Sequence, residues 1–433
     1  MDITPFRDRR RRLLESMASG VAVLPTASEK TRNRDSHYPY RADSYFQYLT
    51  GFTEPEAVLV LIAGDAPKSV LFCRERDPDK EIWDGFRHGP ELAREVFGFD
   101  EAHAIVAFDH MLPELIANQP ALWHALGADP SWDARIATAL NAVRAQSRAG
   151  KRPPAAIYDP RTLLDEMRLI KDTYEIALMR RAADITAEGH RRAMRAAAPG
   201  RYEYELEAEL LHEFRRRGSQ FPAYSSIVAA GANACVLHYV SNDRRMGDGE
   251  MLLIDAGCEL DGYAADISRS FPVNGRFSGA QADVYGLVLA AQQAAIAAVR
   301  PGASFIAPHD AAVKVLVQGM IDLKLLAGSF DGAMETESYK RFYMHRTSHW
   351  LGSDVHDVGE YKAGDDWRPL APGMVLTVEP GCYIRPGDDL PPAFWNIGVR
   401  IEDDVLVTGA GCEILTAQAP KSIVEIEALM RDG

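Results

Sequence analysis

The sequence predicts an α+β protein of two domains. Its 433 residues exceed the length of one ordinary domain. In the later part of the chain, helices followed by acid-bearing strands occur twice, over 172–271 and over 279–405. Hydrophobic residues make up 47% of the chain and charged residues 25%, as in a globular protein with a large core. We therefore expect a mixed α/β domain followed by a domain in which helices cover one face of an antiparallel sheet.

Residues 1–166 are predicted to form the first domain. Apolar runs predict three buried strands, at 57–62, 69–73 and 104–109. Periodic apolar positions predict three helices, near 90–97, 111–126 and 133–147. The four arginines of 9–12 are expected on the solvated face of a short helix. The Pro- and Gly-rich segment 148–160 predicts a linker to the second domain, 167–433.

The second domain is predicted to start with a long helix. Asp172 and Glu175 have the spacing of a capping box at its N-terminus. Three further helices are expected, at 204–218, 279–300 and 307–326. Residues 226–239 read as strand, turn and strand.

Residues 251–271 predict a β-hairpin that carries two aspartates. With the turn centred on Leu260-Asp261, Asp255 and Asp266 lie opposite each other. With the turn on Asp261-Gly262, Asp255 faces Ser268, and Asp266 is its diagonal neighbour. The two carboxylates share a face in both registers, where a cation or a proton must offset their repulsion. A solvated hairpin with two unrelated aspartates is the alternative interpretation.

More candidate ligands follow at or near the ends of apolar strands. Segment 344–359 contains His345, His349 and His356. Glu379 ends the run 375–379, and Glu402 alternates with apolar residues in 398–404. Four carboxylates at one site need about four positive charges, which two divalent metals supply. One imidazole among oxygen ligands suits Mn²⁺, Co²⁺ or Zn²⁺ better than Ca²⁺.

Four segments in this order resemble the pita-bread metallopeptidases, and among them the proline-specific aminopeptidase P group. They are IDAGCELDGYAADISRSFPVNG, MHRTSHWLGSDVHDVG, TVEPG and RIEDD. The resemblance implies a pita-bread catalytic domain with two divalent metal ions, foremost Mn²⁺. It implies that Asp255 binds one ion and that His349 and Glu379 bind the other. Asp266 and Glu402 would bridge the two.

The resemblance also assigns the other side chains of the site. Glu379 would be the general base or proton shuttle, and His238 and His356 would hydrogen-bond the substrate and the oxyanion. The pocket for the proline ring would be lined by His345, Tyr383 and Arg400. Arg400 is also placed to neutralise Glu402 from the same strand face. Three residues of the first domain, namely Asp35, Arg41 and Trp83, would approach an active site, including that of a neighbouring subunit.

The resemblance predicts an aminopeptidase that removes the residue before a proline in peptides, through attack of a water activated between the metals. A prolidase, a metal-free creatinase-like amidinohydrolase and a binding module without metals are the alternatives. The net charge of −14 argues against nucleic-acid or anionic-membrane partners. Five cysteines without paired spacing and no apolar leader predict a cytoplasmic protein, and we expect a homodimer or homotetramer.

Overall fold

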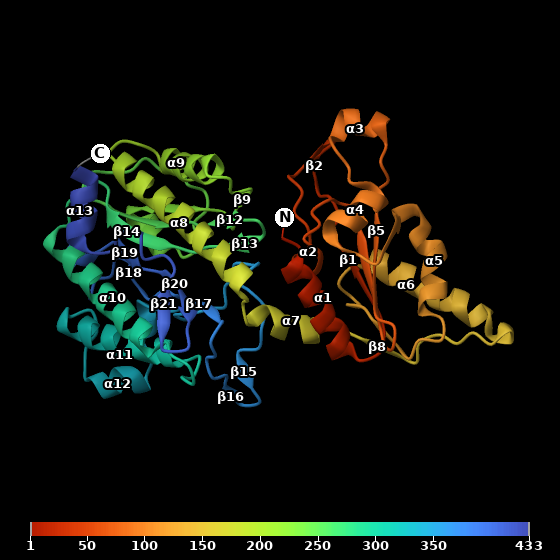
Figure 1. The fold of residues 1–433 in the computed structure, drawn as a ribbon. Helices are drawn as coiled ribbons and strands as arrows, with labels where there is room; N and C mark the ends of the chain where they lie inside the picture. The colour runs from red at the N-terminus through yellow and green to blue at the C-terminus, as the bar shows by residue number, and fades with distance from the viewer. Residues whose placement is uncertain (1, 432–433) are drawn as a thin grey trace. The chain divides into compact units, whose positions relative to one another are not determined.

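The computed structural model describes residues 2–431 and divides the chain into two compact units. The first unit ends at Asp165 and the second begins at Glu166. Each unit has its own β-sheet structure, helices and hydrophobic core (Figure 1). The fold class is the one predicted, a mixed α/β unit followed by an antiparallel α+β unit.

A six-stranded mixed sheet forms the centre of the first unit, in the order β6-β5-β4-β1-β7-β8. Its strands are β1 (Gly20–Pro25), β4 (Val58–Ala63), β5 (Lys68–Cys73), β6 (Glu101–Ala104), β7 (Ala121–Trp123) and β8 (Ala156–Tyr158). A separate ribbon pairs β2 (Thr31–Asn33) with β3 (Ser36–His37). The helices are α1 (Thr4–Met17), α2 (Ser44–Thr50), α3 (Pro78–Asp84), α4 (Gly89–Phe97), α5 (Phe108–Ile116) and α6 (Pro130–Ala145). Helix α7 (Arg161–Leu169) runs across the boundary between the units.

Three predicted elements of the first unit need correction. The helix expected near 111–126 ends at Ile116, and β7 occupies Ala121–Trp123. The expected strand 104–109 is the end of β6 and the start of α5, because Phe108, Leu112 and Ile116 have helical spacing and are all buried. The expected linker 148–160 contains β8, which pairs in parallel with β7 at the edge of the sheet. A three-residue strand is too short to produce a clear apolar pattern.

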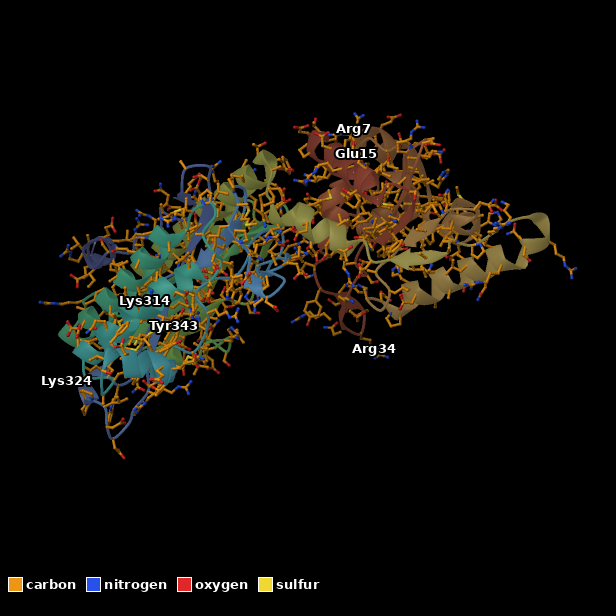
Figure 2. All side chains as sticks on the ribbon, turned by 90° about the horizontal axis from the view of Figure 1, so that it is seen from below. Arg7, Glu15, Arg34, Lys314, Lys324 and Tyr343 are labelled. Atoms are coloured by element: carbon orange, nitrogen blue, oxygen red, sulfur yellow. The ribbon has the colours of Figure 1, made fainter. Side chains whose placement is uncertain are left out.

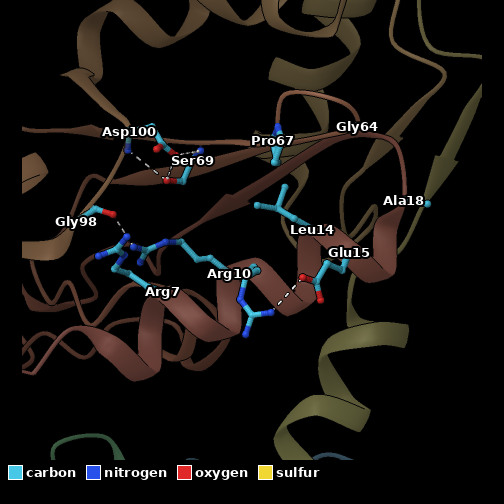
Figure 3. A pocket seen from close by; sticks show the side chains of 11 residues that line it. Arg7, Arg10, Leu14, Glu15, Ala18, Gly64, Pro67, Ser69, Gly98 and Asp100 are labelled. Atoms are coloured by element: carbon cyan, nitrogen blue, oxygen red, sulfur yellow. Dashed lines mark hydrogen bonds and ion pairs between the residues drawn. The ribbon is translucent and has the colours of Figure 1, made fainter.

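The arginines of α1 are also not all solvated. Arg10 is buried, and its guanidinium donates to the backbone oxygens of Leu49, Phe97 and Gly98. Arg9 is buried too and donates to the Tyr48 oxygen. Figure 3 shows Arg10 beside Gly98 in the pocket along α1. These carbonyls end helices α2 and α4, so the arginines satisfy acceptors that the helices leave open.

The second unit consists of antiparallel strands and two long helix pairs, α8 with α9 and α10 with α11 (Figure 1). Its helices are α8 (Thr173–Ala196), α9 (Glu203–Arg216), α10 (Gly279–Ala298), α11 (Ala307–Asp322), α12 (Phe330–Glu335) and α13 (Ile423–Arg431). Its first strands are β9 (Phe221–Pro222), β10 (Ile227–Ala230), β11 (Met251–Asp255), β12 (Cys258–Leu260), β13 (Tyr263–Ala264) and β14 (Ser268–Pro272). The later strands are β15 (Lys362–Ala363), β16 (Asp366–Trp367), β17 (Val375–Val378), β18 (Gly381–Ile384), β19 (Ile397–Arg400), β20 (Asp403–Val407) and β21 (Cys412–Ile414).

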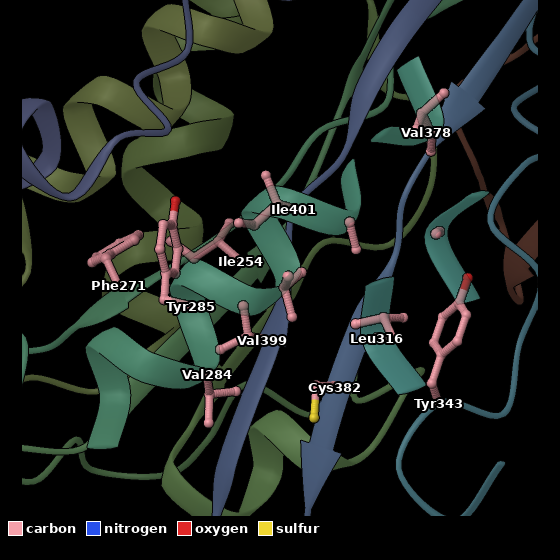
Figure 4. Close-up of a cluster of buried hydrophobic side chains, with 14 of the residues drawn as sticks. Ile254, Phe271, Val284, Tyr285, Leu316, Tyr343, Val378, Cys382, Val399 and Ile401 are labelled. Carbon is pink, nitrogen blue, oxygen red and sulfur yellow. The ribbon is translucent and has the colours of Figure 1, made fainter. Parts of the chain in front are cut away.

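One large core joins these helices to the strands. Val284, Leu316, Ile254 and Val399 all belong to it, and Figure 4 shows them between α10, α11 and the strands. The exposed face of α11 is polar, and Figure 2 labels its exposed residue Lys314. The predicted capping box of α8 is present, with Asp172 accepting from the Glu175 backbone. No helix of the described chain is long and apolar enough to cross a membrane.

The hairpin 251–271 adopts the second of the two predicted registers. Asp255 pairs with Ser268, and Leu260 pairs with Tyr263 across an Asp261-Gly262 turn. Both turn residues have positive φ, 51° and 82°, as a type I′ turn requires. The register places Asp255 at the end of β11 and Asp266 just before β14.

Two other strand predictions in the second unit need correction. Residues 236–239 form no strand, because β10 is followed by a 3₁₀ turn at Gly231–Cys235. The predicted strand 398–404 is interrupted, since β19 ends at Arg400 and β20 starts at Asp403. Glu402 therefore lies in a two-residue break, which frees its carboxylate from the alternation of a regular strand.

Candidate metal centre and active site

Strand ends of the second unit bring the acidic side chains together. Asp255 ends β11 and Asp266 precedes β14, while Glu379 directly follows β17. Asp266, His349 and Glu402 each place a ligand atom within 4.8 Å of the others. The Nε2 atom of His349 lies 3.5 Å from Oδ2 of Asp266 and 3.7 Å from Oε1 of Glu379. The five predicted ligand residues thus converge on one site.

Backbone hydrogen bonds fix the segments that carry His349 and Glu379. The Thr377 amide donates to the His349 oxygen at 3.0 Å, and the Glu379 amide donates to the Thr347 oxygen at 2.8 Å. The Nδ1 atom of His349 lies 2.8 Å from the Trp350 oxygen, to which it donates. Nε2 is therefore the nitrogen turned to the carboxylates, as a metal-binding imidazole needs.

Tyr224 joins the two aspartates of the hairpin. Its hydroxyl lies 2.6 Å from Oδ1 of Asp255 and also forms a hydrogen bond with Oδ1 of Asp266. Burial, together with the two negative charges, raises the pKa of this hydroxyl, so it is a neutral donor. The sequence analysis missed Tyr224, because it belongs to no acidic motif and lies between β9 and β10.

Ser268 links Glu402 to Arg400. Its hydroxyl donates to Oε2 of Glu402 at 2.8 Å and accepts from Nε of Arg400 at 2.8 Å. Nη2 of Arg400 donates to Oδ2 of Asp255 at 2.6 Å. The direct ionic partner of Arg400 is thus Asp255, whereas the strand alternation had suggested Glu402. The sequence signal for Ser268 was its position opposite Asp255 in the hairpin.

A buried ion pair supports the backbone beside Glu402. Arg269 donates to the Glu402 oxygen at 2.5 Å and to Oδ1 of Asp403 at 2.8 Å. The Asp403 carboxylate also accepts from Gln292 and Lys421. Both charges of the Arg269–Asp403 pair are completely buried, so the break between β19 and β20 is rigidly held.

The electrostatics indicate a surplus of negative charge. Burial raises the pKa of Glu379 to about 8, against the attraction of His349 and Arg400. Burial and the Asp255 charge raise the pKa of Asp266, and burial and the Asp266 charge raise that of Glu402. Burial also opposes ionisation of Asp255, but the Arg400 charge keeps its pKa low.

This donor set fits divalent metal ions. The four carboxylates have the Arg400 guanidinium and the His349 imidazole as their cationic neighbours, so their charge is not balanced by these groups. Burial would lower the pKa of His349, but the Asp266 hydrogen bond and the Glu379 charge raise it to about 9. The proton on His349 thus supplies a positive charge beside these carboxylates, as a bound metal cation would.

A hydrogen-bonded chain runs along the wall of the site. Nη1 of Arg400 donates to the Tyr383 hydroxyl at 3.0 Å, and this hydroxyl lies 2.8 Å from Nε2 of His345. Nδ1 of His345 lies 2.8 Å from the Arg346 oxygen. Burial, followed by the Arg400 charge, lowers the pKa of His345 to about 4. His345 is therefore neutral, with Nε2 accepting from Tyr383.

His356 and His238 lie at the exposed side of the cluster. The His356 ring is 4.3 Å from the His349 ring, centroid to centroid, at 71°. Burial and the His349 and His238 charges lower the pKa of His356. His238 also affects His345 electrostatically, so the three histidines share one region.

The other three predicted residues belong to the first unit. Asp35 is exposed between β2 and β3, and Trp83 on α3 is 86% exposed. Nη1 of Arg41 donates to the Ser44 hydroxyl at 3.0 Å. The geometry of the second unit does not involve these residues, so their roles stay predictions.

Comparisons with known proteins match both units of the chain. Residues 177–409 match the model of metallopeptidase family M24, and residues 6–123 match the aminopeptidase P N-terminal domain. The chain is 47% identical to the Xaa-Pro aminopeptidase of Escherichia coli over 428 residues, which cover 98% of this chain and 97% of that protein. It is 36% identical to the human Xaa-Pro aminopeptidase 3, with 94% and 80% covered.

Solved structures give the same result. The Pseudomonas aeruginosa aminopeptidase PepP is 50% identical, with a TM-score of 0.98 over 100% of this chain and 98% of that one. A zinc-substituted E. coli aminopeptidase P in complex with product is 46% identical, with a TM-score of 0.97 over 100% and 99%. The chain therefore belongs to metallopeptidase family M24 and, within it, to the Xaa-Pro aminopeptidases.

Proposed function

We propose that this chain hydrolyses the peptide bond between an N-terminal residue and a following proline, with the help of two divalent metal ions. The observation that carries the proposal is the cluster of four carboxylates and His349 in the second unit. The likeness over the whole chain to Xaa-Pro aminopeptidases supports this activity over a prolidase, a creatinase-like amidinohydrolase or a metal-free binding module.

Asp255 would hold one ion, and His349 and Glu379 the other. Asp266 and Glu402 would bridge both ions. When bound, such ions polarise a carbonyl and lower the pKa of a water molecule. One imidazole among oxygen donors favours Mn²⁺, with Co²⁺ or Zn²⁺ as alternatives.

Glu379 would act as the base and proton shuttle. Its carboxylate borders His349 and His345, at 3.7 and 3.8 Å. A carboxylate placed beside the reacting water can accept a proton from it and return it later in the reaction. Glu379 would pass this proton to the proline nitrogen as the bond breaks.

His238 and His356 would hydrogen-bond the substrate from the exposed side. Donors aimed at the oxyanion stabilise the transition state more than the substrate. His345 and Tyr383 would form the wall against the proline ring, because their mutual hydrogen bond holds both rings in place. An Xaa-Pro bond has no N–H, so this pocket must recognise ring shape.

Arg400 argues against a prolidase. Three of its five N–H groups donate within the protein, to Ser268, Tyr383 and Asp255, and the Asp255 carboxylate already pairs with its charge. A prolidase must bind the free carboxylate of the proline, which needs a cation with available donors. In the proposed function, the part of the substrate peptide that follows the proline would instead extend out of the site.

We further propose a homodimer or homotetramer in the cytoplasm. Ile82, Trp83 and Phe86 are all more than half exposed in the first unit, and such apolar patches mark interaction surfaces. Asp35, Arg41 and Trp83 would complete the site of a neighbouring copy. Five unpaired cysteine thiols, four of them buried, suit a reducing compartment.

The test is kcat/KM for a matched peptide series with Mn²⁺ added. Xaa-Pro-Zaa tripeptides should be cleaved between Xaa and Pro, and only when the amino terminus is free. Xaa-Pro dipeptides should be poor substrates, and Xaa-Ala-Zaa should be worse than its proline parent. A dipeptide cleaved faster than its tripeptide would establish a prolidase instead. Chelator should abolish all of these activities.

A further inference from the structure

Asp357, which follows His356 in the chain, is held by two buried cations. Its Oδ1 accepts from Nη2 of Arg168 at 2.6 Å, and its Oδ2 accepts from Nζ of Lys171 at 2.8 Å. The side chains of Asp357, Arg168 and Lys171 are at most 1% exposed. Burial would raise the pKa of Asp357, but the Lys171 and Arg168 charges lower it, so the carboxylate is ionised. Burying three charges costs desolvation free energy, which only close, well-aligned ion pairs can offset.

The ring of His356 lacks comparable support. Among residues 2–431, no hydrogen bond holds the His356 ring, whose neighbour is His349 at 4.3 Å. His356 is exposed, whereas the residue after it is buried. The position of the imidazole therefore depends on the backbone from which it projects.

That backbone has no regular secondary structure. Residues 351–358 belong to no helix or strand, and the loop closes where the Asp357 amide donates to the Trp350 oxygen at 3.0 Å. The Asp357 carboxylate also packs on Gly352, where an added Cβ would lie 2.1 Å from Oδ2. One side chain thus joins both ends of the loop to Arg168 and Lys171.

We propose that Asp357 is a positioning residue that aims His356 at the substrate through its ion pairs with Arg168 and Lys171. This inference rests on the proposed function, in which His356 hydrogen-bonds the substrate. Arg168 lies in the last turn of α7 and Lys171 just after this helix, so both partners of Asp357 are outside the motifs that carry the site. Asp357 itself touches no part of the carboxylate cluster described above.

The main variant is Asp357→Asn, which keeps the shape of the side chain and removes its charge. With Xaa-Pro-Zaa and Mn²⁺, kcat should fall about 10-fold or more while KM and metal content stay unchanged. Asp354→Asn is the matched control, because Asp354 also accepts from Arg168, at 2.7 Å, but is 39% exposed. The control should keep most of the activity. Loss of metal or an unchanged kcat in Asp357→Asn would overturn the proposal.

A double variant separates positioning from a structural role. In the His356→Ala background, adding Asp357→Asn should cause little further loss, because the two residues act through the same imidazole. If the two losses multiply, Asp357 acts elsewhere and the proposal fails. If Asp357→Asn does not fold, Lys171→Met takes its place in the same double-variant comparison, because it removes one of the two ion pairs of Asp357.

A readout without catalysis distinguishes this inference from the proposed function. In histidine-labelled, metal-free protein, the ring signal of His356 should shift or broaden in Asp357→Asn and stay in place in Asp354→Asn. An unchanged His356 signal in Asp357→Asn would refute the positioning role. If the unaltered protein cleaves no Xaa-Pro peptide, the proposed function fails, and the ring signal still decides whether Asp357 positions His356.

Discussion

Nη2 of Arg400 donates to Oδ2 of Asp255 at 2.6 Å, so the guanidinium that we propose for the proline pocket is bound to a carboxylate of the candidate metal cluster. This pair connects the two parts of the site that the sequence placed on separate segments. If Arg400 lines the substrate pocket as proposed, this pair links substrate binding to the charge of the carboxylate cluster.

Arg400→Lys tests whether Arg400 binds a substrate carboxylate. A lysine keeps the charge but cannot donate to Asp255, Tyr383 and Ser268 at once, so kcat/KM should fall by about 10²-fold. The ratio of tripeptide to dipeptide cleavage should stay the same, because in the proposed function Arg400 does not bind the free carboxylate. A selective loss of dipeptide cleavage would show that it does.

Asp266→Ala and Glu402→Ala test the bridging assignment. Each should lower metal occupancy at both sites, as measured by elemental analysis of dialysed, metal-reconstituted protein. Glu413→Gln is a control, because Glu413 is a partly exposed carboxylate of the same unit that pairs with Arg180. Retention of two ions in either alanine variant would show that the ligand set is wrong.

The metal-free protein should lose stability as pH rises. The folded-state pKa of Glu379 is raised to about 8 from 4.5, and that of His349 to about 9 from 6.5. In both cases the folded state binds protons more tightly than the unfolded chain, so the stabilisation is complete below the unfolded pKa values. It is lost as pH rises from about 4.5 to about 9.

Metal ions favour the ionised carboxylates, so the Tm difference between metal-loaded and metal-free protein should grow between pH 5 and 8. Thermal unfolding at several pH values checks this. Glu379→Gln removes one of the titrating groups and should flatten the pH dependence of the metal-free protein. A constant Tm difference would contradict the surplus of negative charge.

Arg10 and Arg11 form a matched pair on α1. Arg10→Met should destabilise the first unit by about 3 kcal/mol, because three carbonyl oxygens lose a charged donor. Arg11 is exposed and pairs with Asp8 and Glu15 on its own helix, so Arg11→Met should leave the Tm unchanged. Equal changes in Tm for the two variants would mean that the hydrogen bonds of Arg10 to the ends of α2 and α4 do not stabilise the protein.

The contrast between these two arginines shows what a sequence pattern leaves open. Four consecutive arginines look alike in sequence, and only the neighbouring helix ends decide which are buried. The hairpin and the shared face of its two aspartates were predictable, since they depend on local sequence, whereas two registers remained open and the structure adopts the one with the Asp261-Gly262 turn. Tyr224 was not predictable, because its contact with Asp266 joins residues 42 positions apart and uses a common residue type.

The strand break at Glu402 escaped prediction for a similar reason. Val399 and Ile401 alternate with Arg400 and Glu402 as in a regular strand, and this pattern gives no sign of an interruption. The break follows from Arg269, a residue far away in sequence, whose guanidinium binds the Glu402 oxygen. Local patterns predicted the elements, whereas long-range polar contacts set the details of the site.

The ion pairs of Asp357 also define how much chain an autonomous catalytic fragment must contain. The match to family M24 covers 177–409, which includes all five cluster residues. Arg168 and Lys171 precede it, and Lys421, a partner of Asp403, follows it. A fragment cut at those limits would leave Asp357 without both of its cations and Asp403 without one of its two. We therefore expect a stable catalytic fragment to extend beyond the M24 match at both ends, because these buried carboxylates need their cationic partners.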